Sequence, residues 1–259
     1  MAARLSFPAL CVTALAALLT ISAPASAQQS LCADCHFANA GGPNPIHLHE
    51  WDLSAHGRAG VGCEACHGGN PRTVESFLAH QMIVRGHGLE NPVNRRNLPA
   101  TCGKCHSGPY TEFQSSRHYL LLRNGDPAAP SCSTCHGDVA AYLLSPKGLE
   151  SECNGCHGRG KKQERAEYAA NARYLLQATR DTRALLDSAR SLIKRVTDPK
   201  MRESLQYDYE QAAVPLQEAA HAGHSFVFDK VEERLGVAMA RAEALADRLA
   251  NLSVRTPSR

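Results

Sequence analysis

Five copies of one short pattern, Cys-x-x-Cys-His, lie between residues 32 and 157 and constrain the fold more than any other feature. Two thiols in this pattern can add to the vinyl groups of one porphyrin while the adjoining imidazole binds iron, so each copy predicts a c-type haem. The ten thiols belong to Cys32, Cys35, Cys63, Cys66, Cys102, Cys105, Cys132, Cys135, Cys153 and Cys156. The proximal histidines are His36, His67, His106, His136 and His157. A zinc knuckle or a redox dithiol is the alternative, but neither requires the adjoining histidine.

Residues 1–27 have the pattern of a cleavable signal peptide. Arg4 precedes an apolar run from about Pro8 to Ile21, and Ala25-Ser26-Ala27 forms a small-residue cleavage site. The run is shorter than the about 20 residues of a membrane span, and an uncleaved anchor is the alternative. Cys11 would leave with the signal, so every remaining cysteine would belong to a motif. We therefore expect a periplasmic protein, with an extracellular location as the alternative.

The charge balance gives no reason to expect a nucleic-acid partner. The formal net charge of +3 falls to +2 without Arg4, because residues 1–27 contain no acidic residue. Each haem would add two propionates, so the loaded protein should be mildly acidic in spite of its basic sequence. We therefore expect redox proteins as partners.

The composition predicts a mainly α fold with much irregular loop. Residues 28–160 are rich in glycine, proline and asparagine and lack a long helical or β-strand pattern, so the chain should wrap around five haems that serve as its core. Residues 161–250 are rich in alanine, leucine, arginine and glutamate and predict an antiparallel helical hairpin or bundle. Residues 251–259 are expected to form a tail.

Three helices are expected in the C-terminal region, over about 163–196, 199–222 and 226–249. Asp198 is the expected N-cap of the second helix and Pro199 its first residue, while Pro215 should bend or break it. Apolar side chains recur at three-four spacing on the first and third helices. They include Tyr168, Leu175, Leu186, Ile193, Val227, Val231, Leu235, Ala238, Ala242, Leu245 and Leu249. These faces would also suit a homodimer.

Eight further histidines are candidates for the distal position on the irons. They are His56, His118, His224, His87, His80, His47, His49 and His221. Five irons need at most five distal ligands, so at least three of the eight would be spare. Met82, Met201 and Met239 are the alternatives, but none has a familiar ligand setting. Bis-histidine ligation without a methionine predicts low potentials.

An internal repeat ranks the candidates. His56 and His118 each follow an aromatic residue by five positions and a serine by two, and each precedes a motif. These two are therefore the strongest candidates. His224, beside the break at Gly223 between two helices, is favoured over His221. His87 and His80 come next, and His47 and His49 share one short loop, so only one of that pair is expected to bind.

Three segments, 51–68, 89–106 and 113–137, resemble the multihaem cytochromes related to hydroxylamine oxidoreductase, its tetrahaem electron acceptor and ammonia-forming nitrite reductase. Residues 221–245 are similar to the C-terminal helices of that family, where a histidine near a helix start ligates a haem. The resemblance implies closely stacked haems, bis-histidine ligation and helix-mediated dimers in some members. This chain departs from the nitrite reductases, which replace one motif histidine by lysine. It also shows no local pattern for the tyrosine that hydroxylamine oxidoreductases crosslink to a haem.

These observations favour an electron carrier, with no catalytic residue assigned. A membrane quinol dehydrogenase upstream and a reductase downstream are the expected partners. The first alternative is a reductase or oxidase of a small nitrogen or sulfur oxyanion with one open-site haem, for which Tyr110, Arg117, His118 and Tyr119 form a candidate cluster. The second alternative is a subunit of a haem filament.

Overall fold

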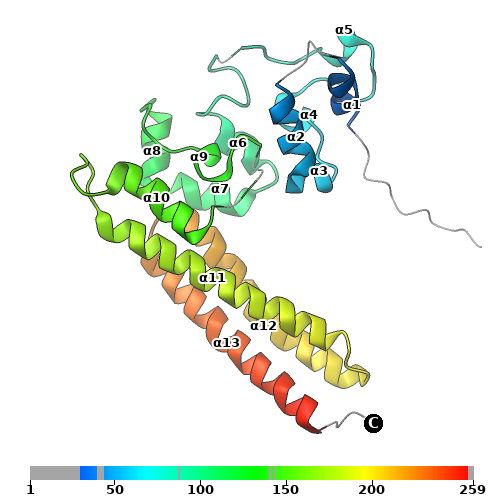
Figure 1. Ribbon diagram of the computed structural model, residues 1–259, viewed down its shortest axis with the longest axis vertical. Coiled ribbons are helices and arrows are strands. Elements are labelled where there is room, and N and C mark those ends of the chain that lie inside the picture. Colours follow the sequence, from blue (N-terminus) through cyan, green and yellow to red (C-terminus); the bar gives the residue numbers. More distant parts are fainter. Residues whose placement is uncertain (1–29, 40–43, 87, 140–141, 143, 256–259) are drawn as a thin grey trace, which may run out of the picture.

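The computed structural model describes residues 30–39, 44–86, 88–139, 142 and 144–255, so the expected signal peptide and His87 lie outside the described residues. The described chain is mainly helical and contains no strand, which confirms the predicted fold class (Figure 1). Its elements, in chain order, are α1 (Leu31–Ala38), α2 (Pro45–Leu53), α3 (Ala55–Arg58), α4 (Glu64–His67), α5 (Ser76–Ala79), α6 (Leu98–Gly103), α7 (Ser107–Gln114), α8 (Arg117–Arg123), α9 (Cys132–His136), α10 (Pro146–His157), α11 (Ala166–Ile193), α12 (Pro199–Ala222), η1 (Gly223–Ser225) and α13 (Phe228–Arg255). None of the described helices is long and apolar enough to cross a membrane.

The N-terminal region, through α10, consists of short helices joined by irregular segments. Polar side chains begin several of them: Ser54, Ser116 and Ser145 accept hydrogen bonds from backbone N–H groups in the first turns of α3, α8 and α10. The motif helices α4 and α9 end at Gly68 and Gly137, whose φ angles of 76° and 77° are readily adopted only by glycine. Each of these two motifs therefore occupies about one turn of helix, followed by a sharp change of direction.

Few hydrophobic side chains are buried in this region. Those that are buried are Ala33, Leu48, Pro99, Phe113, Leu122 and Ala129. Many large apolar side chains are exposed instead, and they include Phe37, Ile46, Leu53, Phe77, Met82 and Leu120. Such a segment has little apolar core of its own, which fits a fold built around a large apolar cofactor.

The C-terminal helices α11, α12 and α13 form an antiparallel three-helix bundle, one of the two arrangements that the sequence predicts (Figure 1). Its core includes Leu175, Leu186, Ile193, Leu205, Leu216, Val231, Leu235, Leu245 and Leu249. Among the residues of the predicted apolar faces that lie outside it are Tyr168 and Val227. Each is 44% exposed, near the end of the bundle that meets the haem-motif region. The predicted boundary at residue 160 lies in the loop between α10 and α11.

The helix bounds agree with the predictions at some ends and correct them at others. Asp198 caps α12 by accepting a hydrogen bond of 2.7 Å from the N–H of Met201, as expected. The third helix begins later than predicted because Phe226, with φ of 58°, turns the chain out of η1. It then continues through Arg255, into the expected tail.

Pro215 does not break the second helix, contrary to the expectation. It is buried within the continuous helix α12. A proline has no N–H to offer the carbonyl four residues earlier, which belongs to Gln211. Arg241 of α13 replaces that donor by hydrogen bonding to the Gln211 carbonyl at 2.7 Å. The break is therefore avoided through a contact between helices, which sequence reasoning did not consider.

Candidate haem-binding sites

Each of the five motif histidines has its ring close to one other histidine ring. The pairs, with their centroid separations, are His36–His80 at 5.9 Å, His67–His47 at 6.1 Å, His106–His56 at 5.9 Å, His136–His224 at 6.1 Å and His157–His118 at 5.9 Å. No histidine is shared between pairs. The structure thus divides ten histidines into five pairs, each with one motif member.

These separations fit one metal ion between the two imidazoles. A metal–nitrogen bond to histidine measures about 2.0 Å, so two such bonds and the two half-rings place the centroids about 6 Å apart. Ordinary aromatic pairs spread over about 4.5 to 7 Å. The five histidine pairs instead fall between 5.9 and 6.1 Å. The residues present at each motif would therefore suit one metal ion held between two imidazoles.

The remaining candidate histidines lie elsewhere. The ring of His49 packs against Phe37 at 5.3 Å, while its neighbour His47 faces a motif histidine. His221 lies so close to Gly108 that a Cβ atom at that glycine would collide with its ring. His87 is not among the described residues. Of the described candidates, only His49 and His221 have no motif partner.

Backbone carbonyl groups orient four of the paired rings. The Nδ1 atoms of His56, His80, His157 and His224 lie 3.1, 2.7, 2.7 and 3.1 Å from the carbonyl oxygens of Val139, Ser76, Gln163 and Ala220. A carbonyl oxygen only accepts, so Nδ1 must carry the proton, and Nε2 keeps the lone pair that a metal requires. Sequence reasoning missed these carbonyl groups because backbone acceptors leave no residue-specific signal.

His118 is held differently. Its ring meets Phe226 edge-on at 4.4 Å, and its buried Nδ1 has no hydrogen-bond partner among the described residues. Burial lowers the pKa of His118, and the neighbouring His157 lowers it further. Burial likewise lowers the pKa values of His67, His136 and His224. These imidazoles are therefore kept in the neutral form that can bind a metal.

A family model described as cytochrome c554 and c-prime matches residues 15–68, which contain the first two motifs together with His47 and His56. This match over the first two motifs supports a c-type cytochrome. Proteins of this class bind haem covalently through cysteine and transfer electrons. No curated protein and no solved structure matches the chain significantly.

The five motifs follow one another in space in the order of the sequence. Ser30, at the start of the first motif helix, donates a hydrogen bond to the Cys63 sulfur of the second motif at 3.9 Å. The third and fourth motifs meet where α6 contacts α9, and there a hydrogen bond with Cys132 lowers the pKa of Cys102 to about 7. Figure 1 shows the same progression from α1 and α4 through α6 and α9 to α10.

Electrostatic interactions link the other consecutive motifs. The pKa of Cys66 is raised by burial and then by the thiol of Cys102, which connects the second motif to the third. Burial raises the pKa of Cys135 to about 11, with a further contribution from Cys153 of the fifth motif. Among the described residues, these links between motif cysteines all join neighbours in the sequence order.

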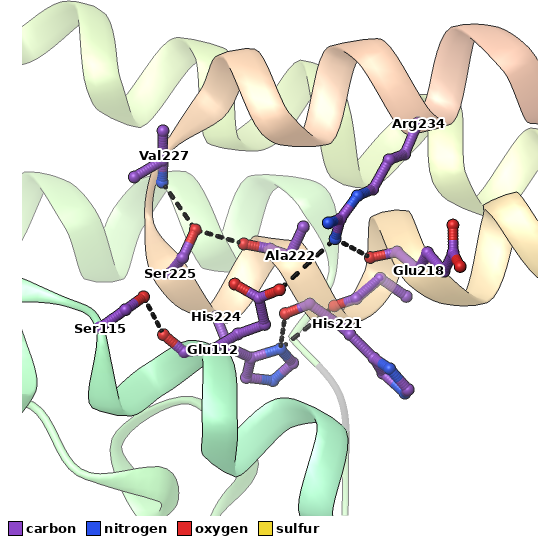
Figure 2. A network of polar contacts seen from close by, with 10 residues as sticks. Glu112, Ser115, Glu218, His221, Ala222, His224, Ser225, Val227 and Arg234 are labelled. Carbon is purple, nitrogen blue, oxygen red and sulfur yellow. Dashed lines mark hydrogen bonds and ion pairs between the residues drawn. The ribbon is translucent and has the colours of Figure 1, made fainter.

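The His136–His224 pair connects the motif region to the helical bundle. Figure 2 shows His224 on its short helix, near Glu112 and Arg234. His224 lies in η1, which contacts α7. Beside it, Arg234 of α13 lies 3.4 Å from the carboxylate of Glu112 in α7 and donates to the Glu218 carbonyl at 3.3 Å. Three segments that are distant in sequence therefore meet at one histidine pair.

The tyrosine cluster proposed for an enzyme is divided in the structure. Tyr110 and Tyr119 face each other at 6.4 Å, whereas His118 turns to His157 and Arg117 is exposed. The cluster therefore does not converge on one motif.

Proposed function

We propose that this cytochrome transfers electrons through five covalently bound haems, each held between the two histidines of one pair. The ten motif cysteines would form the thioether links. The motif member of each pair would be the proximal ligand, and His80, His47, His56, His224 and His118 the distal ligands of motifs one to five. The observation that carries the proposal is the recurrence of the same separation, 5.9 to 6.1 Å, at all five motifs.

The histidine pairs favour electron transfer over catalysis. A c-type haem, when bound, supplies an iron that changes between ferric and ferrous states. Two imidazoles on one iron would leave no position for a substrate, and all five motif histidines have a second histidine facing them. The chain's part is then to fix the spacing, the environment and the potential of each group.

The proposed distal histidines come from segments of the chain other than the motifs that they face. His80 follows the second motif but faces the first, and His56 precedes the second motif but faces the third. His118 faces the fifth motif and His224, from the bundle, the fourth. This crossing supports a rigid array, because the loss of one segment would disturb haems bound by others. Rigid, closely spaced groups suit rapid transfer between neighbours.

The spatial order of the motifs supports transfer along a single row. We also propose that the chain is a pentahaem member of the cytochrome group that includes hydroxylamine oxidoreductase and ammonia-forming nitrite reductase. The motif segments resemble proteins of that group. The N-terminal signal pattern supports a periplasmic location. A membrane quinol dehydrogenase and a periplasmic or outer-membrane reductase are the partners that such a carrier would connect.

Haem counting and a reductive titration test the proposal. The protein, matured by an export and haem-attachment system, should give five haems by the pyridine haemochrome assay and accept five electrons per chain. Reduced protein should not turn over nitrite, hydroxylamine or sulfite. Fewer than five haems would contradict the ligand assignment, and steady turnover of one oxyanion would favour the enzyme alternative.

A further inference from the structure

The loop between α10 and α11, residues 158–165, carries four cations and one carboxylate. The cations are Arg159, Lys161, Lys162 and Arg165, and all four are exposed. None of them forms an ion pair with another described residue. The carboxylate, Glu164, is also exposed and accepts a hydrogen bond of 2.9 Å from the N–H of Gly160. The loop, with four cations and one carboxylate, therefore presents a net positive charge to solvent.

This loop folds directly onto the fifth motif. The Gln163 carbonyl accepts a hydrogen bond of 2.7 Å from Nδ1 of His157, and the N–H of Arg165 donates to the His157 carbonyl at 2.7 Å. The loop backbone thus orients the proximal imidazole of the fifth motif. In a partner docked on the loop, the path to the iron of the fifth motif would run through the Gln163–His157 hydrogen bond and the His157 imidazole.

One carboxylate near the loop is engaged elsewhere. Glu150 of α10 is already paired with Arg173 of α11 at 3.1 Å. The opposite end of the row has the opposite sign, because residues 31–67 contain four acidic side chains and one arginine. These are Asp34, Glu50, Asp52, Glu64 and Arg58. The two ends of the row should therefore attract different partners.

We propose that residues 158–165 form the docking surface for an acidic redox protein, which exchanges electrons with the haem of the fifth motif. The proposal rests on the proposed electron-transfer function and adds the place of exchange and the chemistry of the partner. Opposite charge on the two surfaces would steer their encounter and raise the association rate, with a strong dependence on ionic strength. The contact between the loop and His157 distinguishes this surface from a general anion-binding patch.

Stopped-flow reduction of the matured cytochrome by flavodoxin, a small acidic one-electron donor, tests the proposal. The test variant combines Lys161→Glu with Lys162→Glu. The matched control combines Lys194→Glu with Arg195→Glu, which makes the same change in net charge at the exposed far end of the bundle. At low ionic strength the test variant should be reduced about tenfold more slowly than the wild type, and the control within about twofold. The difference should disappear at high salt.

Dithionite separates this proposal from the proposed function. If dithionite reduces all haems in every variant, the array is intact and only docking has been changed. Equal slowing in the test and control variants, or no slowing in either, would overturn the docking surface. Binding of the loop to anionic vesicles, or self-association through the acidic end of a second copy, without an effect on flavodoxin would overturn it too. If the double variant fails to mature, Lys161→Gln with Lys162→Gln should still slow reduction about threefold.

Discussion

Arg241 donates a hydrogen bond of 2.7 Å to the carbonyl of Gln211, the carbonyl that Pro215 leaves without its helical donor. The contact lies between α12 and α13 and allows a proline to be accommodated inside a continuous helix. A kink would move the end of α12 that leads into η1, where His224 is positioned. The way in which α12 accommodates Pro215 therefore affects the position of His224, and with it the His136–His224 pair.

Arg241→Ala should lower the free energy of unfolding of the bundle by about 1 kcal/mol, because the Gln211 carbonyl loses its donor. In a Pro215→Ala background the helix supplies its own N–H, so the same arginine substitution should cost clearly less. Chemical denaturation of the four proteins, followed by helical circular dichroism, measures this coupling. Equal costs in both backgrounds would show that Arg241 does not compensate for the proline.

Replacement of a distal histidine should change the spin state of one haem. His118→Ala and His224→Ala each remove one ring from a pair, so each variant should show one high-spin ferric haem and four low-spin haems by EPR. His49→Ala and His221→Ala are the matched controls, because neither ring faces a motif histidine. A high-spin signal in a control, or an unchanged spectrum for His118→Ala, would contradict the pairing.

The ion pair between Arg234 and Glu112 should contribute little to stability. Its side chains are 36% and 20% exposed, and such pairs are worth at most about 1 kcal/mol. Arg234→Gln should therefore lower the unfolding free energy by less than about 1 kcal/mol, with a smaller effect at high salt. Denaturation at two ionic strengths measures this. A loss of several kcal/mol would mean that the pair, rather than the His136–His224 link, holds the bundle to the motif region.

Without haem, the two regions should differ in protease resistance. The bundle has its own apolar core, whereas the described residues from 30 to 157 bury few hydrophobic side chains. Protein produced without haem attachment should retain the helical signal of the bundle and lose its N-terminal region to limited proteolysis. Mass spectrometry of the surviving fragment identifies the boundary. Equal protection of both regions would show that the motif region folds without its cofactor.

Local patterns predicted much of the helical bundle. The apolar spacing identified Leu186, Ile193 and Leu245 as core residues, and Asp198 as a cap, because these features depend on neighbours within a few positions. The predicted break at Pro215 was wrong, because the replacement donor comes from Arg241, 26 positions along the chain and on another helix.

The positions of the histidines were also predictable only in part from the sequence. The repeated aromatic-serine-histidine pattern singled out His56 and His118, and both rings face motif histidines. The choice of His47 over His49, and the motif that each ring faces, depend on how distant loops cross. Sequence spacing carries no information on that crossing. The sequence analysis did not single out the cationic loop at 158–165, because its contact with His157 is visible only in the fold.

EPR of the oxidised, fully matured protein, with spins quantified against the haem count, tests the five-pair arrangement most directly. Five low-spin ferric haems, with no high-spin signal, are expected if every motif histidine shares its iron with the second histidine that faces it. A persistent high-spin signal from one haem in five would contradict the arrangement and point to an open iron.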